Sequence, residues 1–356
     1  MEVQNVTIIR EIILIGFIFE PILEIILFMV FLLIYLVTVL GNALIIALFC
    51  TNHRLQTPMY FFLSNLSAIE IFMTTSVMPK MLANLLSERK TISFAGCFTQ
   101  SYFYFFMGST EFILFAAMSF DRYMAICYPL RYPILVTGKV SVKIVIGSWI
   151  GGFLSVFLST VLKARLTYCR HVINHFFCDS APLLHLACQD VTMIELVDFL
   201  VSLILLLGSL SFTATSYIYI ISTIVKIQSV EGRKKAFGTC ASHFTVVSMG
   251  YGISIFVYVR PSQSDSMSLN KALAIFSGIL TPFLNPFIFS LRNEQMKEVL
   301  RDVLGWMKIT ALASLSPMQP ARSGAANYIS WAAAVFFCAG VFWGWSSGGE
   351  WLAGIV

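Results

Sequence analysis

The side chains best suited to chemistry in this chain are an adjacent acid and base. Asp121 and Arg122 end a long apolar stretch, just before basic sequence that contains Pro129. A guanidinium on a long stem can bind the neighbouring carboxylate at rest and, once released, the backbone carbonyls of a partner. An arginine at a helix end can instead extend to the membrane interface without any further role. The pair alone does not separate a switch from an interfacial anchor.

Two further acids lie deep within apolar sequence. Glu70 and Glu111 fall near the middle of two apolar segments, where a carboxylate is costly unless it is paired, protonated or hydrated. Asn42 and Asn285 come at a comparable depth in two other segments. Two acids and two amides at one level predict a cluster that coordinates a sodium ion or water. A protonated pair that joins two helices is the alternative.

Helices must position these groups, because the chain has the composition of a membrane protein. It is 58% hydrophobic and 12% charged, against about 25% charged residues in a soluble domain. Seven apolar segments can each cross a bilayer as a helix, and none alternates like a barrel strand. They cover approximately Ile22–Phe49, Pro58–Leu85, Phe98–Ile126, Val140–Leu162, Ile194–Ile224, Phe237–Val259 and Ala272–Leu291. We therefore predict an all-α, multi-pass membrane protein with seven transmembrane helices.

The distribution of basic residues predicts the orientation of these helices. With the N-terminus outside, thirteen Lys and Arg between Arg54 and Lys308 face the cytosol, against nine from Arg10 to Lys271 outside. This bias satisfies the positive-inside rule. Asn5 begins an Asn-Val-Thr acceptor for glycosylation on the outer side, although so short a sequence also occurs by chance.

Four of the eight cysteines fall on the predicted outer side, which is an oxidising compartment. They are Cys97 at the start of the third segment and Cys169, Cys178 and Cys188 in the long loop before the fifth. Two disulfides are expected, with three possible pairings. His175, Cys178 and Asp179 also have the ligand types of a copper or zinc site. A disulfide at Cys178 would remove the thiolate, so this group is only a weak metal candidate.

Four longer motifs follow one another along the chain. They are Leu55–Tyr60 (LQTPMY), Ser119–Cys127 (SFDRYMAIC), Lys235–His243 (KAFGTCASH) and Pro282–Phe289 (PFLNPFIF). This ordered set resembles the motifs of olfactory receptors, a branch of the rhodopsin-like G protein-coupled receptors, over about residues 5–304. The resemblance implies an odorant receptor that couples to the olfactory stimulatory G protein and raises cyclic AMP. It also implies the disulfides Cys97–Cys178 and Cys169–Cys188.

Within that family resemblance, Arg122 is expected to work as a conformational switch that is freed when helices three and six separate. The predicted switch and coupling residues are Asp121, Arg122, Tyr123, Tyr217, Lys235, His243, Asn285 and Pro286. Pro282 and Pro286 each remove an amide donor, which loosens the seventh helix. Phe289 replaces the usual tyrosine, so Tyr217 is expected to lack a possible water-bridged partner.

A ligand cavity is predicted between the outer halves of helices three, five, six and seven. Its candidate lining residues are Tyr104, Gly108, Ser109, Ser202, Leu205, Tyr251, Ser254, Ile255 and Tyr258. A mostly apolar surface with a few hydroxyls suits a small, volatile, weakly polar molecule. Each aromatic ring could equally serve helix packing, and each hydroxyl could bond its own backbone. Asp198, the nearest acid on helix five, is expected to face the outer water.

The C-terminal part departs from the family pattern. We predict an extracellular N-terminus at 1–21, the receptor domain at 22–291, an amphipathic cytosolic eighth helix at 292–304 and an atypical tail at 305–356. The tail contains a charge-free stretch, Gly324–Gly349, rich in Ala, Gly and Trp. It is long enough for an extra span, but Gly and Ala insert weakly, which favours an interfacial or disordered tail.

Other classes of membrane protein fit the sequence less well. A channel or transporter could use Glu70 and Glu111 as an ion path, but it should show internal repeats, and no motif occurs twice. The sequence has no metalloprotease, dinucleotide or Walker motif, so an enzyme is not expected, and no cofactor beyond a possible sodium ion is predicted. The expected location is the plasma membrane, with lipid, a volatile ligand and a G protein as partners and no nucleic acid.

Overall fold

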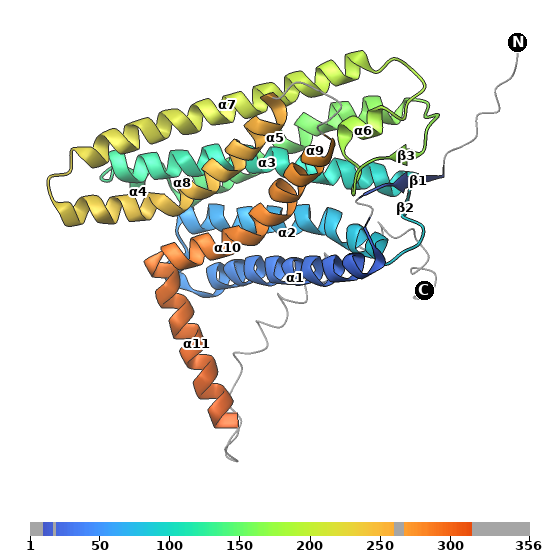
Figure 1. The fold of residues 1–356 in the computed structure, drawn as a ribbon. Helices are drawn as coiled ribbons and strands as arrows, with labels where there is room; N and C mark the ends of the chain where they lie inside the picture. Colours follow the sequence, from blue (N-terminus) through green and yellow to red (C-terminus); the bar gives the residue numbers. More distant parts are fainter. Residues whose placement is uncertain (1–9, 17–18, 260–266, 315–356) are drawn as a thin grey trace, which may run out of the picture.

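A bundle of seven long helices dominates the computed structural model, which describes residues 10–16, 19–259 and 267–314 (Figure 1). The helices are α1 (Pro21–Thr51), α2 (Pro58–Leu85), α3 (Phe94–Cys127), α5 (Gly138–Ala164), α7 (Thr192–Val225), α8 (Val230–Val259) and a seventh made of α9 (Met267–Ile275), the π-helical turn η3 (Phe276–Leu280) and α10 (Thr281–Arg292). Short turns η1 (His53–Leu55), α4 (Tyr132–Leu135) and α6 (Ser180–Leu184) lie in the connections. The predicted mostly helical, seven-helix bundle is confirmed.

Six of the described helices are long and apolar enough to cross a membrane. The remaining long helix of the bundle, α8, is not among these six, although it has 30 residues. Helix α2 lies in the middle of the bundle, with 78% of its most apolar window buried, whereas the corresponding windows of α1 and α7 are each 11% buried. The exposed apolar faces of α1 and α7 are those expected to contact lipid.

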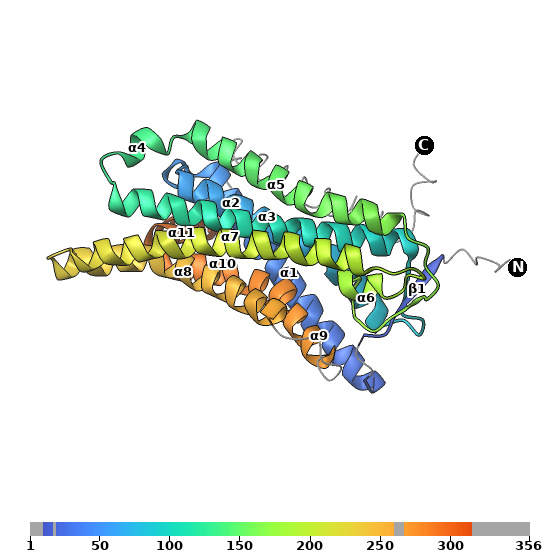
Figure 2. The same ribbon diagram turned by 90° about the horizontal axis from the view of Figure 1, so that it is seen from above.

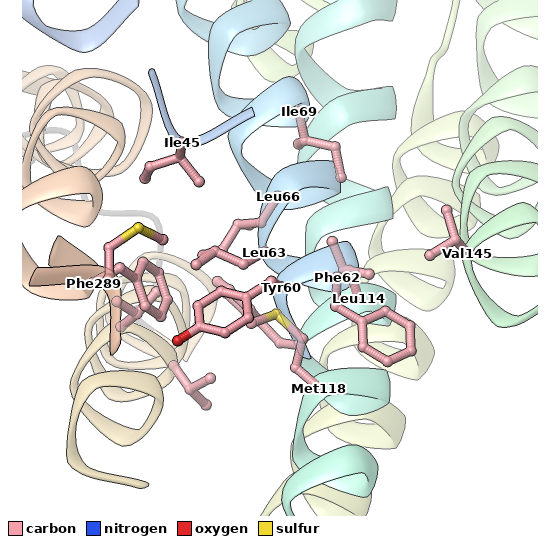
Figure 3. Packing of buried hydrophobic residues seen from close by; sticks show 14 of the residues in the cluster. Ile45, Tyr60, Phe62, Leu63, Leu66, Ile69, Leu114, Met118, Val145 and Phe289 are labelled. Carbon is pink, nitrogen blue, oxygen red and sulfur yellow. The ribbon is translucent and has the colours of Figure 1, made fainter. Parts of the chain in front are cut away.

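The main hydrophobic core joins α2 and α3 to the cytosolic half of the seventh helix. Phe62, Leu63, Phe115 and Phe289 are each at most 1% exposed. Figure 3 shows Phe289 of α10 beside Tyr60 and Leu63 of α2. Because phenylalanine stands at 289, this position contributes a ring without a hydroxyl to the core. The core thereby fixes the cytosolic ends of α2, α3 and α10 relative to one another.

Proline chemistry explains the contact between the first and seventh helices. Pro286 has no N–H, so the carbonyl of Pro282 loses its usual intrahelical donor. Asn42 of α1 donates from Nδ2 to this carbonyl at 3.3 Å and replaces the missing bond. Gly41 allows the approach, since a Cβ there would lie 3.1 Å from Pro286 Cβ. The proline that loosens the seventh helix therefore also attaches it to α1.

A small sheet covers the outer end of the bundle and was not predicted. Its strands are β1 (Glu11–Leu14), β2 (Thr91–Ser93) and β3 (Val172–Ile173), in the order β2-β1-β3. β1 pairs antiparallel with β2 and parallel with β3. The N-terminal segment thus forms the middle strand between two loops, at the end of the bundle where Figure 1 places β1 and β3.

The amphipathic helix after the bundle is longer than predicted. α11 runs from Glu294 to Ser314, where the sequence analysis ended it at residue 304. Pro317 is the first proline after Arg292, so no proline interrupts the helix before Ser314. α11 leaves the bundle at a steep angle (Figures 1 and 2). The tail from 315 to 356 and the proposed glycosylation site at Asn5 lie outside the described residues.

Close packing of α3 on α5 requires a glycine at position 152, which gives a stability prediction. A Cβ at Gly152 would lie 2.0 Å from Thr110 Oγ1 and 2.9 Å from Thr110 N, so a methyl group there must separate the helices. We expect Gly152→Ala to destabilise the protein by about 1–3 kcal/mol. Thermal unfolding of purified protein in nanodiscs measures this change.

Gly147 of the same helix is the matched control. No atom lies within 4 Å of a Cβ built at this position. Gly147→Ala should leave stability unchanged or raise it by up to about 1 kcal/mol through helix propensity. Equal unfolding temperatures for the two alanine variants would show that the α3–α5 contact does not limit stability.

Candidate functional site

The acid–base pair at the end of α3 is buried and internally bonded. Arg122, 7% exposed, donates from Nε and Nη2 to one oxygen of Asp121 at 3.0 and 2.5 Å. The other Asp121 oxygen accepts from the Tyr132 hydroxyl at 2.7 Å, so the turn α4 also holds the acid. Burial, and then the charge of Asp121, raises the pKa of the Tyr132 hydroxyl. Arg122 is thus bonded to its neighbour within the bundle and does not extend freely to the interface.

A side-chain contact between α7 and α8 lies close to this acid–base pair. The Tyr217 hydroxyl lies 2.5 Å from His243 Nδ1, and both residues are buried. Phenylalanine at 289 has no hydroxyl, so the possible water-bridged partner of Tyr217 at that position is missing. The motif that contains His243 supplies the partner instead. The other ring nitrogen, Nε2, is buried without a hydrogen-bond partner among the described residues.

Asp121, Arg122 and His243 line a narrow, closed crevice at the cytosolic end of the bundle. Its lining residues are Met59, Phe62, Met118, Asp121, Arg122 and His243. A larger, mostly apolar cavity of about 370 Å³ opens between the cytosolic ends of α7 and α8, and Arg233 and Lys234 are among its lining residues. Tyr123 packs its ring at 5.6 Å from that of Tyr128. The side chain of Lys235 lies outside the described residues.

The predicted polar cluster brings three of its four members together. Asn285 Nδ2 donates to Glu70 Oε1, and Asn42 reaches the same helix through the Pro282 carbonyl. Three acceptor oxygens are left without a hydrogen-bond partner among the described residues, namely Asn42 Oδ1, Glu70 Oε2 and Asn285 Oδ1. Glu111 of α3 lies close enough to interact electrostatically with Glu70. Buried, unpaired oxygens of this kind suit a hard cation or ordered water.

The predicted ligand residues on α3 lie beneath the outer loop. The Tyr104 hydroxyl is 3.4 Å from Ser277 Oγ of the seventh helix, and its ring centroid is 4.8 Å from that of Phe177. Gly108 has open space where a Cβ would stand. Ser109, Ser202, Leu205, Ser254 and Ile255 are half-buried. The side chain of Tyr258 lies outside the described residues.

Tyr251 begins a chain of long hydrogen bonds toward the predicted switch residues. Its hydroxyl lies 3.4 Å from Thr213 Oγ1 of α7, and Ser119 Oγ of α3 donates to the same oxygen at 3.4 Å. Ser119 precedes Arg122 by one helical turn. The ring of Tyr251 packs at 5.4 Å from Phe112. The hydroxyls of Tyr251, Thr213 and Ser119 therefore link α8, α7 and α3.

The long outer loop contains both disulfides that the family resemblance implied. Cys97 is bonded to Cys178, which ties the loop to α3, and Cys169 is bonded to Cys188 within the loop. Cys178 therefore has no thiolate to give a metal. Burial, and then the charge of Lys271, lowers the pKa of His175 to about 3, while burial raises the pKa of Asp179. Among the described residues no three His, Cys, Asp or Glu side chains are grouped to hold a metal.

Asp198, which was expected to face the outer water, is half-buried and paired. Lys163 of α5 approaches its carboxylate at 2.7 Å, and Ser159 and Ser180 both donate to it. Lys163 also donates to Ser180 Oγ at 2.6 Å. The network joins α5, α7 and the outer loop. The sequence shows one cation and one acid at the outer ends of neighbouring helices. That signal alone does not specify that the two residues pair.

Two further polar residues were missed by sequence reasoning. Thr213 occupies the middle of the chain from Tyr251 to Ser119, and nothing in its flanking sequence distinguishes it from other helical threonines. Lys271 at the outer end of the seventh helix is 7% exposed and bonds to the N-terminal segment and the outer loop. A basic residue at the end of a span is ordinarily an interfacial residue, so its burial was not foreseen.

Comparison with known proteins agrees with the motifs and with the helical bundle. The family model described as olfactory receptor matches residues 31–306. Olfactory receptor 6J1 of Homo sapiens is 51% identical over 302 residues, covering 85% of this chain and 86% of the relative. Olfactory receptor 287 of Rattus norvegicus is 48% identical over 299 residues, covering 84% and 96%. The chain therefore belongs to the olfactory receptor family.

Proposed function

We propose that this receptor binds small volatile molecules in the outer half of the bundle and activates a heterotrimeric G protein of the olfactory stimulatory type, raising cyclic AMP. The plasma membrane is the proposed site of action. The observation that carries the proposal is the linked set of contacts from Tyr251 through Thr213 and Ser119 toward the Asp121–Arg122 pair. These contacts join the predicted ligand region to the cytosolic end of α3.

Binding would act by shifting the population of two conformations. An agonist that packs against Tyr104 and Tyr251 favours the arrangement in which α8 moves away from α3 and α7, because its contacts are better there. That movement separates His243 from Tyr217 and widens the crevice around Arg122. Arg122 can then exchange Asp121 for carbonyl groups of the G protein.

The cytosolic ends of α7 and α8 offer a surface for this partner. The 370 Å³ cavity between them is mostly apolar, and Arg233 and Lys234 contribute positive charge. Glu70, by contrast, is 1% exposed and bonded to Asn285, as in a contact between helices. The alternative role of Glu70 and Glu111 as an ion path gains no support from the family comparisons.

A cyclic AMP assay tests the proposed function. The receptor is expressed with the olfactory stimulatory G protein, surface delivery is confirmed, and a panel of volatile compounds is applied. We expect a concentration-dependent rise in cyclic AMP for at least one compound, absent from cells without the receptor. A response that persists when the G protein is omitted would contradict the proposed coupling.

We also propose that the oxygens of Asn42, Glu70 and Asn285 hold a sodium ion. A cation there satisfies acceptors that are otherwise buried without partners. Purified receptor should unfold at a temperature about 2 °C higher in sodium than in choline chloride of equal ionic strength, as expected for about 1 kcal/mol of ion binding. Glu70→Gln should remove the difference. The same sodium effect in Glu70→Gln would assign it elsewhere.

A further inference from the structure

Lys271 joins two parts of the outer surface that are distant in sequence. Its ammonium donates to the Gly16 carbonyl and to Asn174 Oδ1, each at 2.7 Å, and lies 3.4 Å from the Ile15 carbonyl. Gly16 follows β1, and Asn174 follows β3 in the outer loop. At 7% exposure, Lys271 does not extend its charge into water as a helix-end lysine usually does. The bonds therefore replace most of its hydration.

The segments that Lys271 holds form one layer. We call the outer lid the three strands β1, β2 and β3 with the loop residues 174–178. Ile12 and Leu14 of β1 are at most 1% exposed and pack in one cluster with Cys97 and Cys178. Three strands this short have little stability alone. The lid therefore depends on its attachments to the bundle, of which the Cys97–Cys178 bond is one and Lys271 another.

Rings connect the lid to the predicted ligand region. His175 follows Asn174, and its ring centroid lies 4.6 Å from that of Phe176 and 4.7 Å from that of Phe177. Phe177 in turn packs at 4.8 Å against Tyr104, whose hydroxyl is 3.4 Å from Ser277. A chain of packed rings, from His175 through Phe177 to Tyr104, therefore connects the residue after Asn174 to a predicted ligand contact.

We propose that Lys271 is a positioning residue that holds the N-terminal strand and the outer loop closed over the ligand region, and that breaking its bonds opens the route for ligand access. The inference rests on the proposed odorant site. The bonds of Lys271 go to both the N-terminal segment and the outer loop, so their loss frees the end of β1 and the tip of the loop together. The Cys97–Cys178 bond keeps the lid attached while it opens.

Chemical access to a cysteine beneath the lid tests the proposal without any odorant. Ser277→Cys is introduced, and intact cells are treated with a charged, membrane-impermeant methanethiosulfonate. The modification rate is read on purified surface receptor, with the chain that lacks the new cysteine as background. Adding Lys271→Met should raise the rate about tenfold, the scale expected when charge-assisted hydrogen bonds are lost. Lys271→Arg keeps the charge and donors, so it should restore a slow rate.

Arg165→Met is the matched control, because Arg165 is an exposed cation on the outer side, at the end of α5 and outside the lid. It should leave the rate unchanged. If Lys271→Met does not reach the surface, Asn174→Ala takes its place and should raise the rate about threefold, since it removes one acceptor only. An unchanged rate in the variant that reaches the surface, or an equal increase in Arg165→Met, overturns the proposal. The test uses no odorant, so a negative result would refute the role of Lys271 in closing the lid without refuting activation of the receptor by odorants.

Discussion

Arg122→Ala is expected to reduce odorant-stimulated cyclic AMP at least about tenfold, with surface delivery close to that of the parent, since each 1.4 kcal/mol lost from the active complex is one such factor. The guanidinium makes two bonds to Asp121 at the crevice where the G protein would enter. Alanine supplies no donor for carbonyl groups of the partner, so the active complex loses charge-assisted bonds. Concentration–response curves with equalised surface expression measure the effect.

Arg131→Ala is the control for this substitution. Arg131 lies in the same cytosolic region and is exposed, so its alanine variant removes the same charge without touching the crevice. We expect its response to equal that of the parent. Arg122→Lys should fall between the two, because lysine keeps the charge and loses the planar arrangement of donors. A full response in Arg122→Ala would show that the proposed switch does not involve this residue.

Cys178→Ala is expected to abolish surface delivery and ligand response. Its bond to Cys97 spans 81 residues and attaches the outer loop to α3. Closing a loop of that length stabilises the folded chain by about 4–5 kcal/mol, compared with a usual total stability of about 5–15 kcal/mol. The lid that packs on Tyr104 loses its covalent anchor as well. Flow cytometry of intact cells and thermal unfolding of purified receptor measure both effects.

The second disulfide supplies a graded comparison. Cys169–Cys188 spans 19 residues, so its removal should cost about 3 kcal/mol and leave the loop attached to α3. Cys50 is a free, exposed cysteine, and Cys50→Ser should behave as the parent. Normal delivery of Cys178→Ala, or a larger loss in Cys169→Ala, would contradict the assigned roles of the two bonds.

The helical part of the fold could be predicted because its signals are local. Long apolar segments specify helices in a membrane, and the run ending at Arg122 falls in the last turns of α3 as expected. Pro286 predicted a weakened seventh helix. Its bond from Asn42 could not be predicted, because which side chain reaches the freed carbonyl depends on how α1 packs.

The outer surface could not be predicted because its contacts are long-range. β1 has four residues, and it is a strand only because two loops distant in sequence flank it. Lys163 and Asp198 were visible as charges, but their pairing requires the relative rotation of α5 and α7. The bond between Tyr217 and His243 could not be predicted, because it depends on how α7 packs against α8. Sequence therefore located the predicted switch residues but not all of their bonds.

Nucleotide exchange on a purified G protein tests the central claim most directly. Receptor in lipid nanodiscs is mixed with the olfactory stimulatory heterotrimer, and binding of a non-hydrolysable guanine nucleotide is followed with and without an activating odorant. We expect odorant-dependent exchange by the parent and its loss in Arg122→Ala. Odorant-dependent ion current across a bilayer that contains the receptor, without any nucleotide exchange, would contradict the account and favour an ion path through Glu70 and Glu111.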